Sequence, residues 1–254
     1  MLNPEKHWNT IASHYNQEIF DVFASDKKKI LTKLLKKYRN PKATAIDFGC
    51  GNGKAFPLLT PLFKELIAID ISEELLNQAK ATKSKKISFI HQDLAKPAVN
   101  LPLVDFIFSC NVIMLPDAEK NNQMLRNISQ LLKPGGSSLI IVPSTESILF
   151  SGWRLIDWYK KEGVQPKDIE ASELSYFKGS KSEIIQGIFF IDNVATKHYS
   201  REELEVLLTQ VNLTTISIQK IEYDWITEFD SPPGWMKEPL PWDWLVECKK
   251  VLGD

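Results

Sequence analysis

The sequence predicts an α/β protein built on an open, mostly parallel sheet, and three observations support this fold class. Short apolar runs of strand length alternate with longer segments in which apolar residues recur with helical spacing. The apolar run at residues 44–48 leads at once into a turn rich in glycine. An acid stands at the carboxyl end of each of the first two runs, Asp47 and Asp70, which is where open α/β sheets bind their ligands.

The glycine turn contains Gly49, Gly51 and Gly53, which allow positive φ values and remove the Cβ atoms that would keep a ligand away. Two common nucleotide loops do not fit, because Lys54 occupies the last glycine position of both the dinucleotide fingerprint and the phosphate loop. Asp47 would also repel a phosphate, whereas a carboxylate suits an ammonium group or another cation. The turn therefore favours a ligand that carries positive charge.

Residues 1–40 are expected to form an N-terminal helical segment ahead of the first strand. Residues 5–22 have the apolar spacing of one helix, and a second helix is expected to begin at Ser25 or Asp26 and to end near residue 40. The lysines of this region are interpreted as the water-facing side of that second helix: Lys27, Lys28, Lys29, Lys33, Lys36 and Lys37.

Strand and helix signals alternate after the glycine turn. The expected elements are a helix at 54–59, a strand at 65–71, a helix from Ser72, strands at 87–91 and 104–110, a helix from Asp117 to Leu132, and a strand at 138–142. Ser72 and Asp117 suit the N-cap position, and Glu73 and Glu74 suit the positive end of a helix. Leu132-Lys-Pro-Gly-Gly136 predicts a turn before the strand at 138–142.

Residues 144–197 exceed what a connection after a strand needs. We interpret them as a cap over the substrate, with a surface elaboration or a dimer contact as the alternative. The expected elements after residue 143 are a helix at 153–161, an apolar segment at 184–191, a capping box from Ser200 to Glu203, and strands at 215–225 and 242–251. Nothing resembles a linker between domains, so a single domain at 1–254 is expected.

Composition restricts the class of protein further. The chain has 254 residues, 43% hydrophobic and 25% charged residues, and a net charge of −1, which gives no overall attraction to nucleic acid or to an anionic membrane. Three scattered cysteines do not form a disulfide framework, which favours a reducing compartment. With no signal peptide and no apolar run of membrane-spanning length, the expected location is the cytoplasm, as a monomer or homodimer.

The run Asp47-x-Gly49-x-Gly51-x-Gly53, together with the turn at residues 132–136, resembles the class I (Rossmann-like) methyltransferases that use S-adenosylmethionine (SAM). The resemblance covers residues 40–143 with ordered motifs and 198–252 more loosely. It implies a seven-stranded, mostly parallel sheet flanked by helices, with strand order 3-2-1-4-5-7-6 and an antiparallel last strand. It also implies that SAM is the cofactor and S-adenosylhomocysteine (SAH) the product.

Site residues follow from matching this chain to the family pattern. Asp70 lies 17 residues (70 − 53) after Gly53, close to the roughly 20-residue step at which an acid meets a ribose. The resemblance implies that Asp70 binds the ribose hydroxyls and that Tyr15 lies near the methionine end, with plain helix packing as the alternative for Tyr15. The remaining implied contacts are Asp47, Gly49, Cys50, Gly51 and Gly53 at the methionine end, Ile71, Asp93 and Leu94 at the adenine, and Ser109 lining the site.

Catalysis needs little dedicated chemistry, because the SAM sulfonium already activates its methyl group. The enzyme has to align the nucleophile at near-attack distance and exclude water. Candidates for a further catalytic role are His198, Tyr199 and Asn111, and His198 is more commonly a residue that satisfies local structure.

The acceptor class is inferred from motifs that the chain lacks. Ser109-Cys110-Asn111-Val112 replaces the proline-containing motif of DNA amino methyltransferases, Cys110 lacks the setting of a nucleophile for base methylation, and four scattered histidines offer no metal site. A small-molecule acceptor is therefore the leading hypothesis, without nucleic acid, membrane or metal. Two alternatives stay open: a protein or RNA methyltransferase that docks through residues 144–197, and a SAM-binding protein without methyl transfer.

Overall fold

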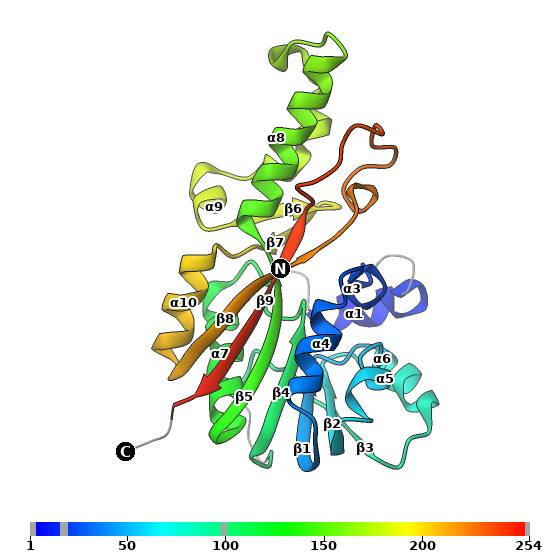
Figure 1. Ribbon diagram of the computed structural model, residues 1–254, viewed down its shortest axis with the longest axis vertical. Helices are drawn as coiled ribbons and strands as arrows, with labels where there is room; N and C mark the ends of the chain where they lie inside the picture. Colours follow the sequence, from blue (N-terminus) through cyan, green and yellow to red (C-terminus); the bar gives the residue numbers. More distant parts are fainter. Residues whose placement is uncertain (1–3, 16–19, 98–100, 252–254) are drawn as a thin grey trace.

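The computed structural model describes residues 4–15, 20–97 and 101–251, and these form a seven-stranded sheet with helices on both faces (Figure 1). The strands are β1 (Asn40–Phe48), β2 (Phe63–Asp70), β3 (Ile87–His91), β4 (Val104–Cys110), β5 (Leu132–Pro143), β8 (Leu213–Glu222) and β9 (Trp242–Lys250). Their order is β3-β2-β1-β4-β5-β9-β8, and β9 runs antiparallel to both neighbours. The expected order and the antiparallel last strand are confirmed.

The α-helices are α1 (Pro4–Ile11), α3 (Val22–Ser25), α4 (Ile30–Lys37), α5 (Phe56–Leu59), α6 (Glu73–Ala79), α7 (Ala118–Leu131), α8 (Thr145–Lys161), α9 (Lys181–Ile185) and α10 (Arg201–Gln210). Short 3₁₀ helices occupy Ala12–His14, Lys80–Thr82, Pro166–Asp168, Ala171–Phe177 and Trp225–Thr227. Ser72 and Asp117 are N-caps, as expected, and their side chains accept backbone N–H groups. Among the described residues, no helix is long and apolar enough to cross a bilayer.

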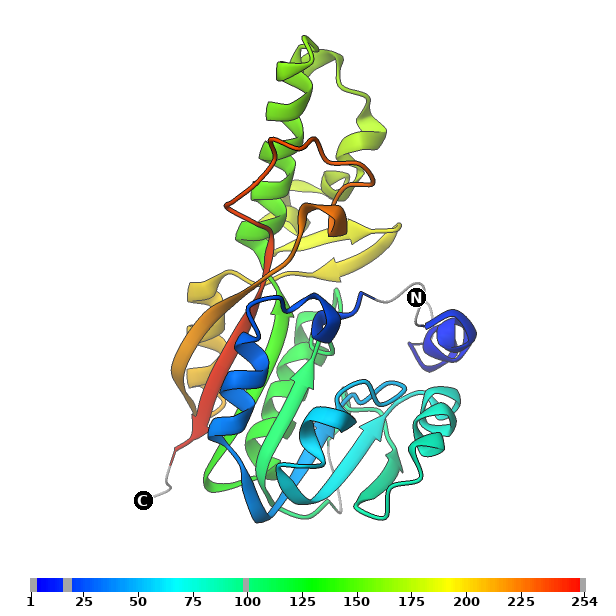
Figure 2. The same ribbon diagram turned by 45° about the vertical axis from the view of Figure 1, so that its right-hand side comes forward.

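Two apolar cores lie on opposite faces of the sheet, because buried parallel strands present hydrophobic side chains on both sides. One core joins the sheet to α7 and α10, through residues such as Leu125 and Leu204. The other joins it to α4, α5 and α6, through residues such as Leu35, Phe56 and Leu76. Figure 2 shows the resulting three layers, with the carboxyl ends of the parallel strands pointing toward the upper part of the molecule.

The insertion, residues 144–197, stands above this carboxyl edge in both views (Figures 1 and 2). It begins directly after β5 with the long helix α8 and returns through an antiparallel hairpin, β6 (Ile188–Ile191) and β7 (Val194–Lys197). The start of α8 is fastened to the sheet, because the Ser147 hydroxyl accepts the Trp242 N–H at 2.7 Å. The proline-rich loop, residues 227–241, lies beside α8 in both views.

The N-terminal segment is less regular than expected. The single helix expected at 5–22 is wrong: α1 ends at Ile11, a 3₁₀ turn follows, and Asp21 caps a new short helix, while 16–19 lie outside the described residues. The next helix begins at Ile30 rather than after Ser25 or Asp26. Asp26 nevertheless accepts the N–H groups of Ile30 and Leu31, at 3.0 and 2.9 Å, which satisfies the first turn of α4.

Three further expectations need correction. Leu132-Lys-Pro-Gly-Gly136 is not a separate turn but the irregular start of β5, whose pairing with β4 shifts register there. The helix expected at 153–161 already begins at Thr145 because Ser144 caps it. Only half of the capping box forms: Ser200 accepts the Glu203 N–H, but the Glu203 carboxylate instead binds Lys197, at 2.7 and 2.8 Å.

The lysines expected to face water do more than cover one helix. Lys27 pairs with Asp224 and Lys28 with Glu222, while Lys37 and Tyr38 both bind Glu247. Lys27 and Lys28 also precede α4 instead of lying on it. These contacts link residues 27–38 to β8, to the residues just after it, and to β9.

Candidate functional site

The glycine turn connects β1 to α5 at the carboxyl edge of the sheet. The N–H groups of Gly49 and Cys50 both donate to the Ile69 carbonyl at 2.9 Å, which draws the turn against the end of β2. Gly49, Gly51 and Gly53 have φ values of 79°, 52° and 90°, a region that favours glycine. A Cβ on Gly49 would lie 2.3 Å from Val112, so the turn has no room for a side chain there.

Asp47 presents an unbalanced carboxylate beside this turn. Its side chain is 2% exposed, and its Oδ2 atom accepts no hydrogen bond from the described residues. Burial, and to a smaller extent the nearby Asp70 charge, raises the pKa of the Asp47 carboxyl to about 8. A buried acceptor without a donor is costly, so the site fits a ligand that brings a donor or a positive charge to Asp47.

Asp70 binds the same turn from the end of β2. Its Oδ2 atom accepts the Gly51 N–H at 2.7 Å and its Oδ1 atom accepts the Ser72 N–H at 2.8 Å. Burial raises the Asp70 pKa, and these backbone bonds oppose the rise. Each carboxylate oxygen has a second lone pair, so Asp70 can hold the turn and still accept two hydroxyl groups.

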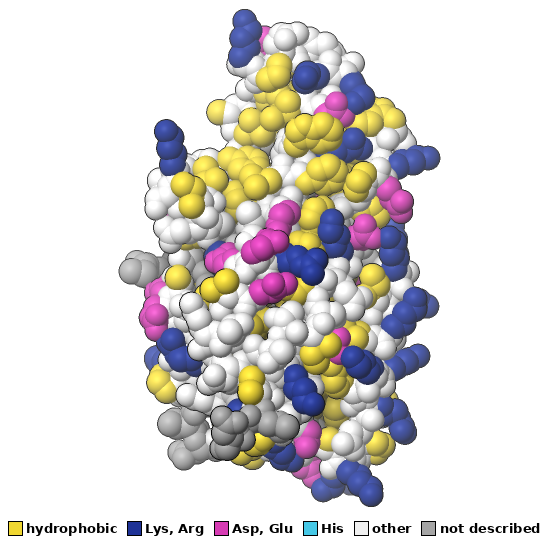
Figure 3. Space-filling view, turned by 60° about the vertical axis from the view of Figure 1, so that its left-hand side comes forward, with side chains coloured by type: hydrophobic (Ala, Val, Ile, Leu, Met, Phe, Trp, Pro, Cys, Tyr) yellow, Lys and Arg dark blue, Asp and Glu magenta, His cyan; other side chains and the backbone are white. Residues whose placement is uncertain are grey.

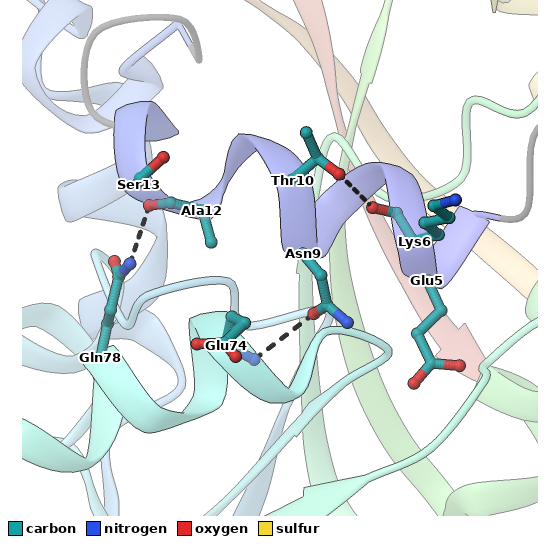
Figure 4. A pocket seen from close by; sticks show the side chains of 8 residues that line it. All are labelled: Glu5, Lys6, Asn9, Thr10, Ala12, Ser13, Glu74 and Gln78. Carbon is teal, nitrogen blue, oxygen red and sulfur yellow. Dashed lines mark hydrogen bonds between the residues drawn. The ribbon is translucent and has the colours of Figure 1, made fainter.

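Tyr15 lies over the glycine turn, because a Cβ on Gly51 would come within 2.5 Å of the Tyr15 hydroxyl oxygen. Desolvation, followed by the charge of Asp70, raises the Tyr15 pKa. Helix α1 is held in place because the Asn9 amide oxygen accepts the Ser72 hydroxyl at 2.6 Å and Gln78 donates to the Ala12 carbonyl at 2.8 Å. Figure 4 shows the polar pocket between α1 and α6, which lies among these anchoring contacts.

The other implied cofactor residues surround the same edge. Ile71 follows Asp70 directly, and its carbonyl lies 2.8 Å from the His91 ring nitrogen. Asp93 caps the turn after β3 by accepting the Ala95 N–H at 2.9 Å. Leu94 is buried in the core, and its carbonyl accepts the Asn127 amide at 2.9 Å. Ser109 is fully buried in β4, with a hydroxyl that finds no partner among the described residues.

His198 and Tyr199 lie between the insertion and α10. Burial lowers the His198 pKa to about 4, and its ring packs edge-on against Phe189 at 5.1 Å. Tyr199 is buried in the core beside α10, and burial raises its pKa. Its backbone pairs with Pro143 and Thr145 at the base of the insertion. These contacts give both residues a structural task.

A network at the start of β9 was not found from the sequence. The Asp243 Oδ2 atom accepts the Tyr223 hydroxyl at 2.9 Å and the Asn111 amide at 3.3 Å. Asn111 has a φ of 53°, which is uncommon for a residue other than glycine. The sequence could have indicated this. Trp242 and Trp244 flank Asp243 and share the core face of the strand, so the acid lies on the opposite face.

The site contains no cluster suited to a metal ion. Within the described ranges, no group of three or more histidine, cysteine or acidic side chains is arranged to hold one. The arrangement therefore offers buried carboxylates, a close-approach glycine turn and hydrogen-bond acceptors, all at one edge of the sheet.

Comparison with known sequences agrees with this arrangement. Residues 45–136 match the family model described as "Methyltransferase domain". The chain is 26% identical over 213 residues to the probable S-adenosylmethionine-dependent methyltransferase CRG1 of Saccharomyces cerevisiae. That match covers 79% of this chain and 63% of the yeast protein, so the chain spans less than two thirds of that relative's length.

Solved structures share the fold over nearly the whole chain. A SAM-dependent methyltransferase from Methanosarcina mazei superimposes with a TM-score of 0.63 and 16% identity, covering 87% of this chain and 98% of the other. The N-methyltransferase NodS from Bradyrhizobium japonicum, solved with SAH, gives a TM-score of 0.62 and 14% identity, covering 98% of this chain and 99% of that one. At such identities the likeness shows the fold.

Proposed function

We propose that this chain, whose residues 45–136 form a methyltransferase domain on the class I Rossmann-like fold, is a SAM-dependent enzyme that methylates a small-molecule acceptor. The observation that carries the proposal is the pairing of Asp47 with the glycine turn. The buried Asp47 carboxylate has an oxygen without a donor, and the turn beside it rejects a Cβ at Gly49. A cationic ligand would satisfy the free Asp47 oxygen, while the clash at Gly49 shows that the turn packs tightly against Val112.

In this proposal SAM lies across these residues from end to end. Asp47 and the glycine turn hold the methionine end, Asp70 accepts the ribose hydroxyls, and Ile71, Asp93 and Leu94 surround the adenine. When bound, SAM supplies a methyl group that its sulfonium has already activated. The chain's own task is then to align the acceptor and to keep water out, which are large contributions to a bimolecular transfer.

SAH formation tests this function directly. The purified protein is incubated with SAM and a mixture of amines, phenols, carboxylic acids and thiols, and SAH is measured by mass spectrometry. We expect SAH to form with at least one class and not without acceptor. Tight SAM binding by calorimetry with no SAH from any class would instead support the alternative of a binding protein without methyl transfer.

SAM affinity should depend on pH because of Asp47. The carboxyl group of the free protein has a pKa of about 8, so it is mostly protonated and neutral below that pH. Binding a cation favours the ionised form, so affinity should fall as pH is lowered from 8.5 to 6.5, approaching about tenfold per unit. Calorimetry across this range measures the effect. The Asp47→Asn variant should bind more weakly and lose the dependence; a flat profile in the native protein would contradict it.

The insertion is proposed to cover the acceptor side of SAM, together with residues 1–40 and the proline-rich loop. The insertion starts at the carboxyl end of β5, on the ligand side of the sheet. At the end of β7, the Lys197 N–H donates to the Met114 carbonyl in the loop after β4. Much of its aromatic surface packs against the proline-rich loop and the turn before it: Phe150 lies 5.6 Å from Trp225, and Trp158 lies 5.9 Å from Phe229. The two segments therefore form one cover.

Hydrogen exchange tests the cover. Protection of residues 151–197 should rise when SAH binds and rise further with an acceptor, because lids belong to the less stable parts of a fold. The first turn of α8, fastened to Trp242, provides an internal control whose exchange should change little. Unchanged exchange across the insertion, alongside protection of residues 45–54, would leave the insertion as a surface elaboration or an oligomer contact.

One observation favours a macromolecular acceptor as the second candidate. Hydrophobic side chains gather on the upper part of the face in Figure 3, and Leu149 and Trp153 of α8 are 48% and 57% exposed. An exposed apolar surface of this kind can bind a partner. Replacing Trp153 by serine should weaken activity only if the acceptor is a protein or RNA that docks there.

A further inference from the structure

The start of β9 brings a carboxylate to the same edge and the same face of the sheet as Asp47. Asp47 pairs with Phe108 across β1 and β4, Cys110 pairs with Ile141 across β4 and β5, and Pro143 pairs with Asp243 across β5 and β9. Because side chains alternate along a strand, Asp47, Cys110 and Asp243 all point to the face that α4 and α5 cover. Cys110 thus stands between the two acids.

The hydrogen bonds to the Asp243 carboxylate do not use all of its acceptor atoms. Both bonds to Asp243, from Tyr223 and Asn111, reach Oδ2, and no described residue donates to Oδ1. Asn111 donates its amide to Asp243, and its own Oδ1 atom is buried without a donor. Asp47, which is 2% exposed, also has a side-chain oxygen without a partner among the described residues. The edge therefore presents several acceptor atoms and lacks donors to match them.

Glu247, another acid of β9, provides a comparison, because its contacts are those of a carboxylate with a structural role. Glu247 lies on the same face of β9 as Asp243 and also binds a tyrosine, Tyr38. Its charge is balanced by Lys37, and its second oxygen accepts the Ser217 hydroxyl at 2.9 Å. Asp243 has no ion pair with any lysine, arginine or histidine in the described part of the chain. Asp243 can therefore accept a positively charged group that the described residues do not supply.

We infer that Asp243, positioned by Tyr223 and Asn111, binds the N–H groups of an amine acceptor and stabilises the positive charge that its nitrogen gains. The inference rests on the proposed methyl transfer and names its substrate class. A primary or secondary amine has at least one N–H group for the Asp243 Oδ1 or Asn111 Oδ1 atoms, whereas a carboxylate substrate has none and would be repelled.

An aliphatic amine first loses its ammonium proton to solvent, and transfer to the neutral amine then needs no separate base. The lone pair of the neutral amine forms the new N–C bond, the C–S bond breaks, and its electron pair stays on sulfur. The positive charge thereby moves from sulfur to nitrogen, and the methylated amine leaves as an ammonium ion. A fixed negative charge beside that nitrogen is more favourable in the transition state than in the ground state, which is the condition for accelerating the step.

The surroundings keep Asp243 charged at neutral pH. Burial raises its pKa to about 6, and the bonds from Tyr223 and Asn111 limit the rise. The other titratable groups whose pKa values respond to Asp243 are Cys110 on β4 and Glu228 after the turn at Trp225. Neither supplies a positive charge, so the carboxylate stays available to the acceptor.

Matched acceptors test the substrate class. SAH release is measured with benzylamine, benzyl alcohol and benzoate, which share a ring and differ in the nucleophile. We expect benzylamine to react at least about 100-fold faster than the other two, the size of effect that one well-placed charge or donor supplies. A rate on benzylamine no higher than on the alcohol or the acid overturns the inference. Methylation of the alcohol or the acid would leave the proposed methyltransferase intact, whereas absence of SAM binding by calorimetry would reject that function.

Two variants separate the role of Asp243 from a structural one. Asp243→Asn should lower kcat on benzylamine by about 100-fold while KM and SAM affinity change little, because the charge matters most in the transition state. Glu247→Gln, the matched control on the same strand face, should keep the amine rate even if it lowers the melting temperature. Equal rates for native protein and a folded Asp243→Asn variant, or an equal loss in Glu247→Gln, overturn the assignment.

Discussion

The Asp70→Ala variant is expected to bind SAM roughly 10- to 100-fold more weakly than the native protein, because losing a charged acceptor costs on the order of 1.5–3 kcal/mol. Two losses contribute: the ribose hydroxyls lose their acceptor, and the Gly51 N–H loses the bond that shapes the turn. Isothermal calorimetry with SAM and with SAH measures the change.

A second acid provides the control for that experiment. Asp105 also accepts a backbone N–H, from Thr44 at 3.2 Å, but it lies at the start of β4, on the opposite edge of the sheet. Asp105→Ala should leave SAM affinity within about twofold, since its contacts do not reach the ligand edge. A folded Asp70→Ala protein with native affinity would reject the placement of the ribose.

Gly49→Ala should be among the most destabilising single substitutions in the chain. The φ of 79° costs an alanine about 1–2 kcal/mol, and the new Cβ, 2.3 Å from Val112, adds about 1–3 kcal/mol of overpacking. Urea unfolding measures the free energy. Gly163→Ala is the matched control: Gly163 has a φ of 86°, with nothing within 4 Å of the new Cβ, so it should show the backbone cost alone.

A double variant isolates the steric part. In Gly49→Ala/Val112→Ala the neighbour that meets the new Cβ is shortened, so the two substitutions should cost less together than the sum of their separate costs. The expected coupling is about 1–3 kcal/mol. Additive costs would show that Val112 does not confine the turn, and the tight approach at Gly49 would need another explanation.

The cofactor half of the fold could be predicted because its strands are buried on both faces. Such strands appear in the sequence as continuous apolar runs, and the bounds expected for β3 and β4 are those observed. Asp47 and Asp70 could be located at the ends of β1 and β2 because each stands at the carboxyl end of one of these apolar runs. Tertiary contacts decided where the sequence failed: β5 absorbs the Lys-Pro-Gly-Gly segment through a register shift with β4, which local turn signals do not encode.

The proposed acceptor site was harder to predict because it is assembled from distant segments. Trp242 and Trp244 make the strand around Asp243 look like core in the sequence. The partners of Asp243 lie just after two other strands: Tyr223 follows β8 and Asn111 follows β4. Only the antiparallel placement of β9 brings its first residues to the ligand edge. His198 and Tyr199, chosen for their chemistry, are instead buried where the insertion meets α10.

The contacts between residues 27–38 and the last two strands have a consequence for synthesis on the ribosome. Lys27, Lys37 and Tyr38 bind partners 197, 210 and 209 positions further along the chain. Such long separations delay contact formation, because the intervening chain must first exist and then close a large loop. Residues 27–38 should therefore reach their final contacts only after β8 and β9 have been synthesised, although they precede both strands by about 200 positions.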